Sequence, residues 1–239
     1  MTGAGRLAGR LLLVAAAAGL ALAGQAAPPI TPPTTLAQVV RALNQAAPQI
    51  HAVSATAQVA DYTALVQDTS RSSGSFAFRR TDRGPMYALD LTSPPEAARR
   101  LVYRDQTAWV YTPASKEVVK YVLRGKRALV DQYLSLGMGA SGDELARSFR
   151  LQFAGAEVLE GVPTVKLTLT PLHAELAGKL TRIDLWYDTR TWIAAQQQIF
   201  QQGGDYHLVH YGEVKRNPAL PDRVFSTRFP GATVIVPQG

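Results

Sequence analysis

Cysteine is absent from this chain of 239 residues, and histidine is scarce, with only four residues. Without cysteine there are no disulfides and no thiolate metal ligands, and so few histidines seldom build a transition-metal site. Two catalytic patterns are also missing, the Gly-x-Ser-x-Gly turn of hydrolases and the His-Glu-x-x-His helix of zinc proteases. We therefore predict a protein that is not an enzyme and that uses no metal and no cofactor.

Long apolar runs are also few. Residues 11–24 are apolar or small, and they follow Arg6 and Arg10 in a stretch that has no acidic residue. This run of about fourteen residues is shorter than the roughly twenty that span a bilayer. With small residues after it for cleavage, it predicts a secretory signal peptide over residues 1–26. Because no cysteine is available for a lipid anchor, we expect the mature chain to be free and soluble outside the cytoplasm.

The chain carries a formal net charge of +7, and its basic residues come in small groups. We predict no nucleic-acid partner, because the protein is expected outside the cytoplasm. Such groups are most often solvated faces, while an acidic partner protein or anionic lipid headgroups are the functional alternatives. The groups are Arg79, Arg80 and Arg83; Arg99, Arg100 and Arg104; Arg124, Lys126 and Arg127; and Lys215 and Arg216.

Proline marks the start of the folded part of the chain. Residues 27–35 contain four prolines and predict an extended linker. A helix should follow, because Thr35 can cap it and the apolar residues from Leu36 to Leu43 repeat at helical spacing. Pro48 should end this helix. No internal repeat or second domain is visible beyond it, so we predict a single domain over residues 36–239.

From Ala55 onward the apolar residues alternate with a period of two, which is typical of β-strands. Turn residues at 105–106, 160–161 and 203–205 separate these runs at hairpin spacing. The pattern predicts a mainly β fold of roughly eleven strands, in a meandering antiparallel sheet that is large enough to curl. Residues 224–229 are expected to form one of its last strands.

Residues 125–147 interrupt the strand pattern. Apolar residues at helical spacing predict a first helix that ends at Gly137, and Ser141 with Glu144 predicts a capping box for a second. The glycines between them match the dinucleotide-binding string Gly-x-Gly-x-x-Gly. Because this string follows a helix and not a strand, we interpret it as a hinge between helices.

Three stretches of the chain carry a resemblance to a known family. The first is the helix with the extended run after it, residues 36–62. The second comprises residues 74–80 (GSFAFRR) and 101–113 (LVYRDQTAWVYTP), and the third is residues 217–225 (NPALPDRVF), followed by Phe229 and Pro230. In this order and spacing they resemble the LolA/LolB-like family of outer-membrane lipoprotein carriers.

The resemblance implies an unclosed antiparallel β-barrel, covered by a helical lid, with an apolar cavity for acyl chains. It implies that Arg80 couples the barrel to the lid through hydrogen bonds, although Arg79 competes for that role. For the inner face of the lid it implies Leu129, Tyr133 and Leu136. The residues expected to line the acyl-chain cavity are Phe76, Phe78, Leu89, Leu91, Trp109, Tyr111, Leu151, Phe153, Leu167 and Leu185.

The function that the resemblance implies is a soluble, monomeric carrier in the periplasm. Its partners would be an acylated lipoprotein client, an inner-membrane complex that releases the client, and an outer-membrane acceptor. Two alternatives remain open. One is a glycolipid or phospholipid carrier of the same fold, and the other is an envelope-stress sensor module that binds lipid or peptide.

Overall fold

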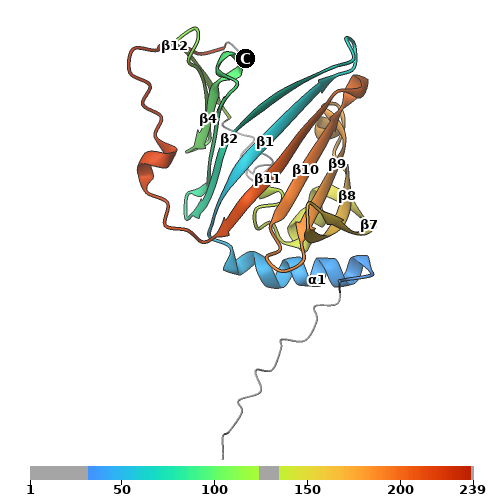
Figure 1. Ribbon diagram of the computed structural model, residues 1–239. Helices are drawn as coiled ribbons and strands as arrows, with labels where there is room; N and C mark the ends of the chain where they lie inside the picture. Colours follow the sequence, from blue (N-terminus) through green and yellow to red (C-terminus); the bar gives the residue numbers. More distant parts are fainter. Residues whose placement is uncertain (1–31, 124–134, 238–239) are drawn as a thin grey trace, which may run out of the picture.

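The computed structural model describes residues 32–123 and 135–237, which build one twelve-stranded sheet with a few short helices (Figure 1). The strands are β1 (Ala52–Thr63), β2 (Asp68–Thr81), β3 (Gly84–Ser93), β4 (Arg99–Arg104), β5 (Thr107–Thr112), β6 (Glu117–Val122), β7 (Phe149–Leu159), β8 (Val162–Pro171), β9 (Leu180–Asp188), β10 (Ala194–Gln201), β11 (Tyr206–Arg216) and β12 (Thr233–Ile235). The helices are α1 (Leu36–Ala46), α3 (Gly142–Ser148) and α4 (Ala174–Ala177), and the 3-10 helices are η1 (Ala47–Gln49), η2 (Pro95–Ala97), η3 (Gln202–Gly204) and η4 (Asp222–Phe225).

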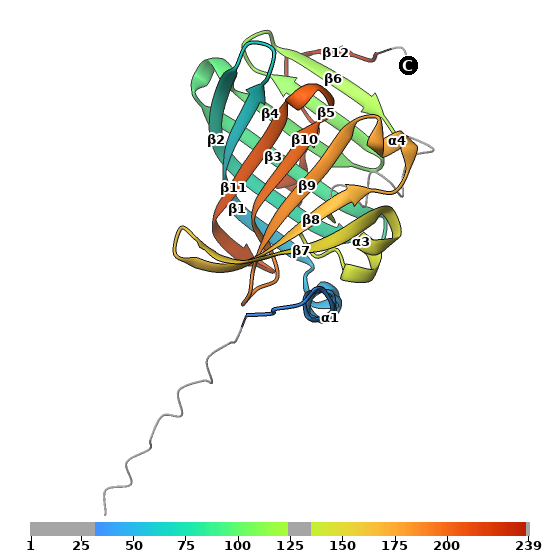
Figure 2. The same ribbon diagram turned by 90° about the vertical axis from the view of Figure 1, so that its right-hand side faces the viewer.

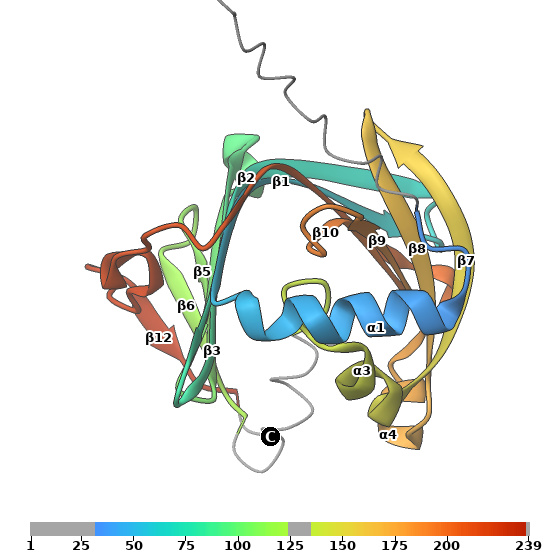
Figure 3. The same ribbon diagram turned by 90° about the horizontal axis from the view of Figure 1, so that it is seen from below.

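The strands follow one another in the order β12-β6-β5-β4-β3-β2-β1-β11-β10-β9-β8-β7. All neighbours are antiparallel except β12, which is parallel to β6. The sheet curls strongly, and its edge strands β12 and β7 lie on opposite sides of the opening (Figure 3). The predicted unclosed antiparallel barrel is therefore confirmed, with twelve strands where the sequence predicts roughly eleven.

Two hairpin turns show how local chemistry sets the strand register. Asp105 and Gln106 join β4 to β5 with φ values of 51° and 58°, and Glu160 and Gly161 join β7 to β8 with 48° and 81°. Left-handed conformations at both central residues match the right-handed twist of the flanking strands. The predicted turns are thus confirmed, including the one that lacks glycine.

Helix α1 lies across one end of the curled sheet (Figure 3). Thr35 caps it as predicted, since its hydroxyl accepts a hydrogen bond from the Gln38 amide, and the Gln38 side chain reaches back to the cap. Val39 and Leu43 face inward and are at most 2% exposed. Among the described residues, no helix is long and apolar enough to cross a bilayer. The predicted signal peptide, residues 1–26, lies outside them.

The segment from Ser135 to Ser148 packs inside the curl. Ser141 and Glu144 form the predicted capping box of α3. Gly137 has φ +77°, and a Cβ there would lie 2.6 Å from the Cβ of Ala194. Only glycine therefore allows this close approach to the start of β10. Leu129 and Tyr133, predicted for the inner face of the lid, lie outside the described residues.

Apolar burial occurs in three clusters. One joins α1 and α3 to the concave face of β7–β9, and a second lies on the concave face of β1–β3 and β11. The third lies on the convex face, where Phe225 is fully buried against β2–β4. The predicted strand over residues 224–229 is wrong. Those residues belong to η4 and an extended segment, because burying Phe225 fixes the chain against the outside of the sheet.

Candidate functional site

The concave face of the sheet holds a cavity of about 400 Å³. This volume falls within the range typical of small-molecule sites, roughly 300–1,000 Å³. Six strands contribute to it, because every second side chain of a strand points to the same face. Its lining side chains are Val59 and Asp61 of β1; Tyr87, Leu89 and Leu91 of β3; Arg99 and Leu101 of β4; Val110 of β5; Gln197 and Ile199 of β10; His207, Val209 and Tyr211 of β11; and Leu136 and Met138.

Two of the residues expected in the acyl-chain cavity, Leu89 and Leu91, line this one. Trp109 and Tyr111 do not, because the register of β5 turns them toward the convex face, where the C-terminal segment packs on Tyr111. Val110, which lies between them, lines the cavity instead. The alternation in the sequence predicts this strand correctly, but it does not reveal which side of the strand is concave.

The other six expected cavity residues lie in the packed clusters of the concave face and not in the lining of this cavity. Phe76 and Phe78 are at most 2% exposed and pack between β1 and β3. The remaining four are fully or partly buried in the cluster beneath α1 and α3, namely Leu151, Phe153, Leu167 and Leu185. Their contact with a ligand stays a prediction.

Leu136, expected on the inner face of the lid, forms part of the cavity wall together with Met138. Both side chains are at most 2% exposed. The chain between them is held by the sheet, since the carbonyl of Gly137 accepts a hydrogen bond from the Ala194 amide at 2.8 Å. This part of the predicted lid therefore belongs to the walls of the cavity.

Arg80 reaches the same segment from β2. Its Nη2 donates a hydrogen bond of 2.7 Å to the carbonyl of Gly139. A guanidinium near an apolar interior needs such acceptors, because an unpaired buried charge is very unfavourable. The contact has the geometry that lid coupling requires, and the coupling itself is still a prediction.

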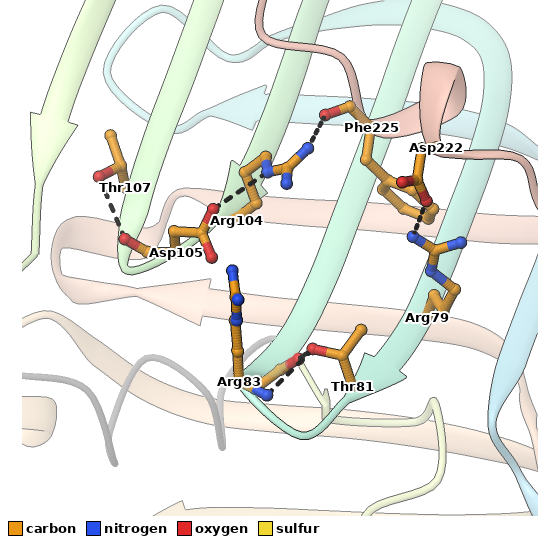
Figure 4. Close-up of polar contacts among 9 residues, drawn as sticks. Arg79, Thr81, Arg83, Arg104, Asp105, Thr107, Asp222 and Phe225 are labelled. Carbon is orange, nitrogen blue, oxygen red and sulfur yellow. Dashed lines mark hydrogen bonds and ion pairs between the residues drawn. The ribbon is translucent and has the colours of Figure 1, made fainter.

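Arg79, the competing residue, points to the convex face and contacts the C-terminal segment (Figure 4). Its guanidinium donates to the carbonyl of Leu220 at 2.8 Å and pairs with Asp222, and it lies 5.1 Å from the centre of the Phe225 ring. The hydrogen bond from Arg79 lowers the pKa of Asp222. Two adjacent arginines thus hold two different segments on opposite faces of one strand.

One end of the cavity is polar, which the sequence analysis missed. His207 Nδ1 is hydrogen-bonded to Asp61 Oδ1, and the second carboxylate oxygen of Asp61 lies 3.6 Å from Arg99 Nη2. The hydrogen bond from His207 is the main cause of a lowered pKa at Asp61. A signal was present, since Asp61 and His207 continue the inward-facing rows of Val59 and Val209.

In the described part of the chain, no group of three or more His, Asp or Glu side chains is placed to hold a metal ion. His207 and His210 lie on opposite faces of β11, where His210 Nε2 is 3.0 Å from Glu160. The mainly apolar lining of the cavity, with one polar end, suits the binding of an apolar or amphiphilic molecule.

Comparison with solved structures shows similarity of fold at low sequence identity. MucB matches with a TM-score of 0.51 and 14% identity, over 83% of this chain and 64% of the MucB chain. An uncharacterized conserved protein from Thermus thermophilus matches with a TM-score of 0.51 and 10% identity, over 84% and 98% of the two chains. A LolA superfamily protein from Nitrosomonas europaea matches with a TM-score of 0.38 and 13% identity, over 82% and 99%. No family model and no curated protein matches the chain.

These similarities concern the fold alone. The sheet is an open curl of antiparallel strands with a helix across one end, and it shares this fold with MucB and with the Thermus thermophilus protein. This chain spans 64% of the MucB chain, so nothing that the whole of MucB does carries over directly.

Proposed function

We propose that this protein is a carrier that binds acyl chains in the cavity on the concave face of its sheet. The main support for this proposal is the cavity itself. It has a volume of about 400 Å³ and mainly apolar walls from β1, β3–β5, β10 and β11. Apolar walls of this kind favour hydrocarbon over water, at about 0.8 kcal/mol for each buried methylene.

The size of the cavity suits reversible binding. Roughly ten buried methylenes would contribute about 8 kcal/mol before the losses of association, which are estimated at about 4–15 kcal/mol. Two or three long chains, fully buried, would approach or pass the limit of about 18–21 kcal/mol seen in real complexes, and release would be very slow. A cavity for part of one chain, or for parts of several, is therefore what a carrier needs.

The more specific role that we propose is carriage of acylated lipoproteins from an inner-membrane donor to an outer-membrane acceptor. The predicted export signal and the sequence resemblance to the LolA/LolB-like family support it. Glycolipid or phospholipid carriage would use the same cavity. Native mass spectrometry of protein purified from the periplasm separates these cases, because a bound lipoprotein and a bound free lipid differ in mass, and an empty cavity would favour a sensor module.

A fluorescent fatty-acid probe tests the acyl-chain proposal directly. Val110 lines the cavity and is only partly buried, so Val110→Trp should fill the space without disrupting a close-packed core. We expect saturable binding to the unmodified protein and at least tenfold weaker binding to Val110→Trp. Val158→Trp is the matched control, because Val158 is 69% exposed on the edge strand β7.

If the unmodified protein binds no acyl probe, the proposal fails. Equal binding by the Val110→Trp and Val158→Trp variants would place the probe elsewhere, and this cavity would then not be the acyl-chain site.

A further inference from the structure

The polar end of the cavity joins residues from strands that are distant in the sheet. Asp61 lies on β1 and Arg99 on β4, and both β2 and β3 separate these strands in the strand order. Their contact crosses the concave face, so only the curl of the sheet brings them together. His207 on β11 is the register partner of Asp61. Figure 2 shows β1, β11 and β10 side by side along this wall.

Arg99 differs from its neighbour Arg100. Arg100 faces the convex side, where it forms an ion pair with Asp90 and donates to the carbonyl of Val224 at 2.8 Å. Arg99 faces the cavity, and its 3.6 Å separation from Asp61 is longer than the roughly 2.7–2.9 Å of a charge-assisted hydrogen bond. Its guanidinium donates no hydrogen bond to the described residues, and its one recorded contact there is with Asp61. A guanidinium has five N–H donors, so Arg99 keeps donors available beside an apolar cavity.

Asp61, by contrast, already interacts with two side chains. Its carboxylate receives the His207 hydrogen bond and faces Arg99, and its side chain is 35% exposed, against 47% for Arg99. With His207 neutral the three side chains carry no net charge, and with His207 protonated they carry one positive charge. No other charged side chain of the described residues lines the cavity. Arg99 is therefore the side chain at this polar end that can pair with an added negative charge.

We propose that Arg99, Asp61 and His207 form a headgroup site for an anionic amphiphile, whose carboxylate or phosphate binds Arg99 while its chain enters the cavity. This inference rests on the proposed acyl-chain function and specifies the ligand class. A carboxylate and a phosphate each present two oxygen atoms that can accept a pair of hydrogen bonds from the N–H groups of a guanidinium. A free fatty acid and a phospholipid are two sources of this chemistry.

The test uses calorimetric titration with ligands of equal chain length, namely dodecanoate, dodecyl phosphate and uncharged dodecanol. We expect both anions to bind more tightly than dodecanol. Arg99→Gln should weaken binding of the anions about tenfold, which corresponds to about 1.4 kcal/mol, and leave dodecanol unchanged. Arg99→Lys keeps the charge and should recover part of the loss. Arg150→Gln, at an exposed position of β7, is the matched control and should change nothing.

The outcomes separate this inference from the function on which it rests. Equal binding of all three ligands, with no effect of Arg99→Gln, would overturn the headgroup site and leave acyl-chain binding intact. Failure of all three ligands to bind would overturn both. If dodecanoate and dodecyl phosphate both respond to Arg99→Gln, the site is supported, and the tighter of the two identifies the carboxylate or phosphate source.

Asp61→Asn should change the affinity for anions in the direction opposite to Arg99→Gln. Removing the negative charge beside Arg99 should strengthen binding of dodecyl phosphate several-fold, because the Asp61 carboxylate no longer repels the anion at the polar end of the cavity. If the three side chains only stabilised the rim, the same variant would weaken the binding of all ligands. That result would count against the headgroup site.

Discussion

The two halves of the concave face are built by the same alternating strands, and yet one is filled and the other is hollow. Over β7–β9, apolar side chains meet α1 and α3 in a cluster where Leu167 and Leu185 are fully buried. Over β1, β3–β5, β10 and β11 the walls enclose a cavity of about 400 Å³. Helices α1 and α3 contribute Val39, Leu43 and Leu145 to the filled half. The described lining of the cavity comes instead from strands and from Leu136 and Met138.

The largest test of this comparison is the removal of a side chain from each half. Leu167→Ala should destabilise the protein by about 2–5 kcal/mol, because the packed cluster cannot collapse around the lost atoms. Leu101→Ala, at the cavity wall, should have an effect nearer 1 kcal/mol, because that side chain already borders empty space. Urea unfolding measures both. Equal losses would show that the two halves are equally close-packed.

A second test concerns the segment around Gly137, which forms part of the cavity wall and approaches the start of β10. Gly137→Ala should destabilise by about 1–3 kcal/mol, since its φ is +77° and the new Cβ would clash with Ala194. Gly161→Ala is the matched control, with φ +81° and no atom within 4 Å of an added Cβ. The difference between the two Tm shifts measures the clash alone. Identical shifts would mean that the segment can move away from β10.

The third test uses the adjacent arginines of β2. Arg80→Leu removes the hydrogen bond to Gly139, a charged-donor bond worth about 1.5–3 kcal/mol when its acceptor stays buried. We expect faster amide exchange in residues 138–145. Arg79→Leu should leave that segment unchanged and loosen η4 instead, because its contacts are on the convex face. Hydrogen exchange that rises in both segments for both variants would contradict this division.

The smallest effects should appear at the extremes of pH. Burial raises the pKa of Tyr187, in the filled half, above its ordinary value of 10.0, so its contribution to stability is present below pH 10 and is lost above it. Asp61, in the hollow half, has a pKa below 3.8, so its contribution is present above that pH and is lost in more acidic solution.

Single variants assign these two effects. Tyr187→Phe should remove part of the alkaline loss, with little change at pH 7, because the buried tyrosine hydroxyl makes no well-formed hydrogen bond within the described residues. Asp61→Asn should reduce the loss of unfolding free energy at acidic pH by less than about 1 kcal/mol, since the carboxylate is partly exposed. Unfolding free energies measured from about pH 2 to about pH 11, a range that spans both ordinary pKa values, check both expectations.

Local patterns predict much of this fold. The caps at Thr35 and Ser141 and the turns at 105–106 and 160–161 are decided by a few neighbouring residues, and all were predicted correctly. Residues 224–229 were not, because they alternate like a strand and yet dock on the convex face through Phe225. That docking depends on strands that lie far earlier in the chain, β2 to β4.

The candidate site shows the same limit. The resemblance implies that Arg80 forms hydrogen bonds to the lid, and in the structure its guanidinium donates to the carbonyl of Gly139. Val110 lines this cavity where its neighbours Trp109 and Tyr111 were expected, since period two is the same on both faces of a strand. Which face becomes concave is a property of the whole sheet.

The sequence by itself determined most of the strands, the turns at 105–106 and 160–161 and the two capped helices, because each depends on side chains close together in the chain. The tertiary structure alone decided which half of the curl is filled and that Asp61 meets Arg99 across it. The physical reason is that the curl is the sum of the twists between many neighbouring strands, and no short stretch of sequence determines that sum.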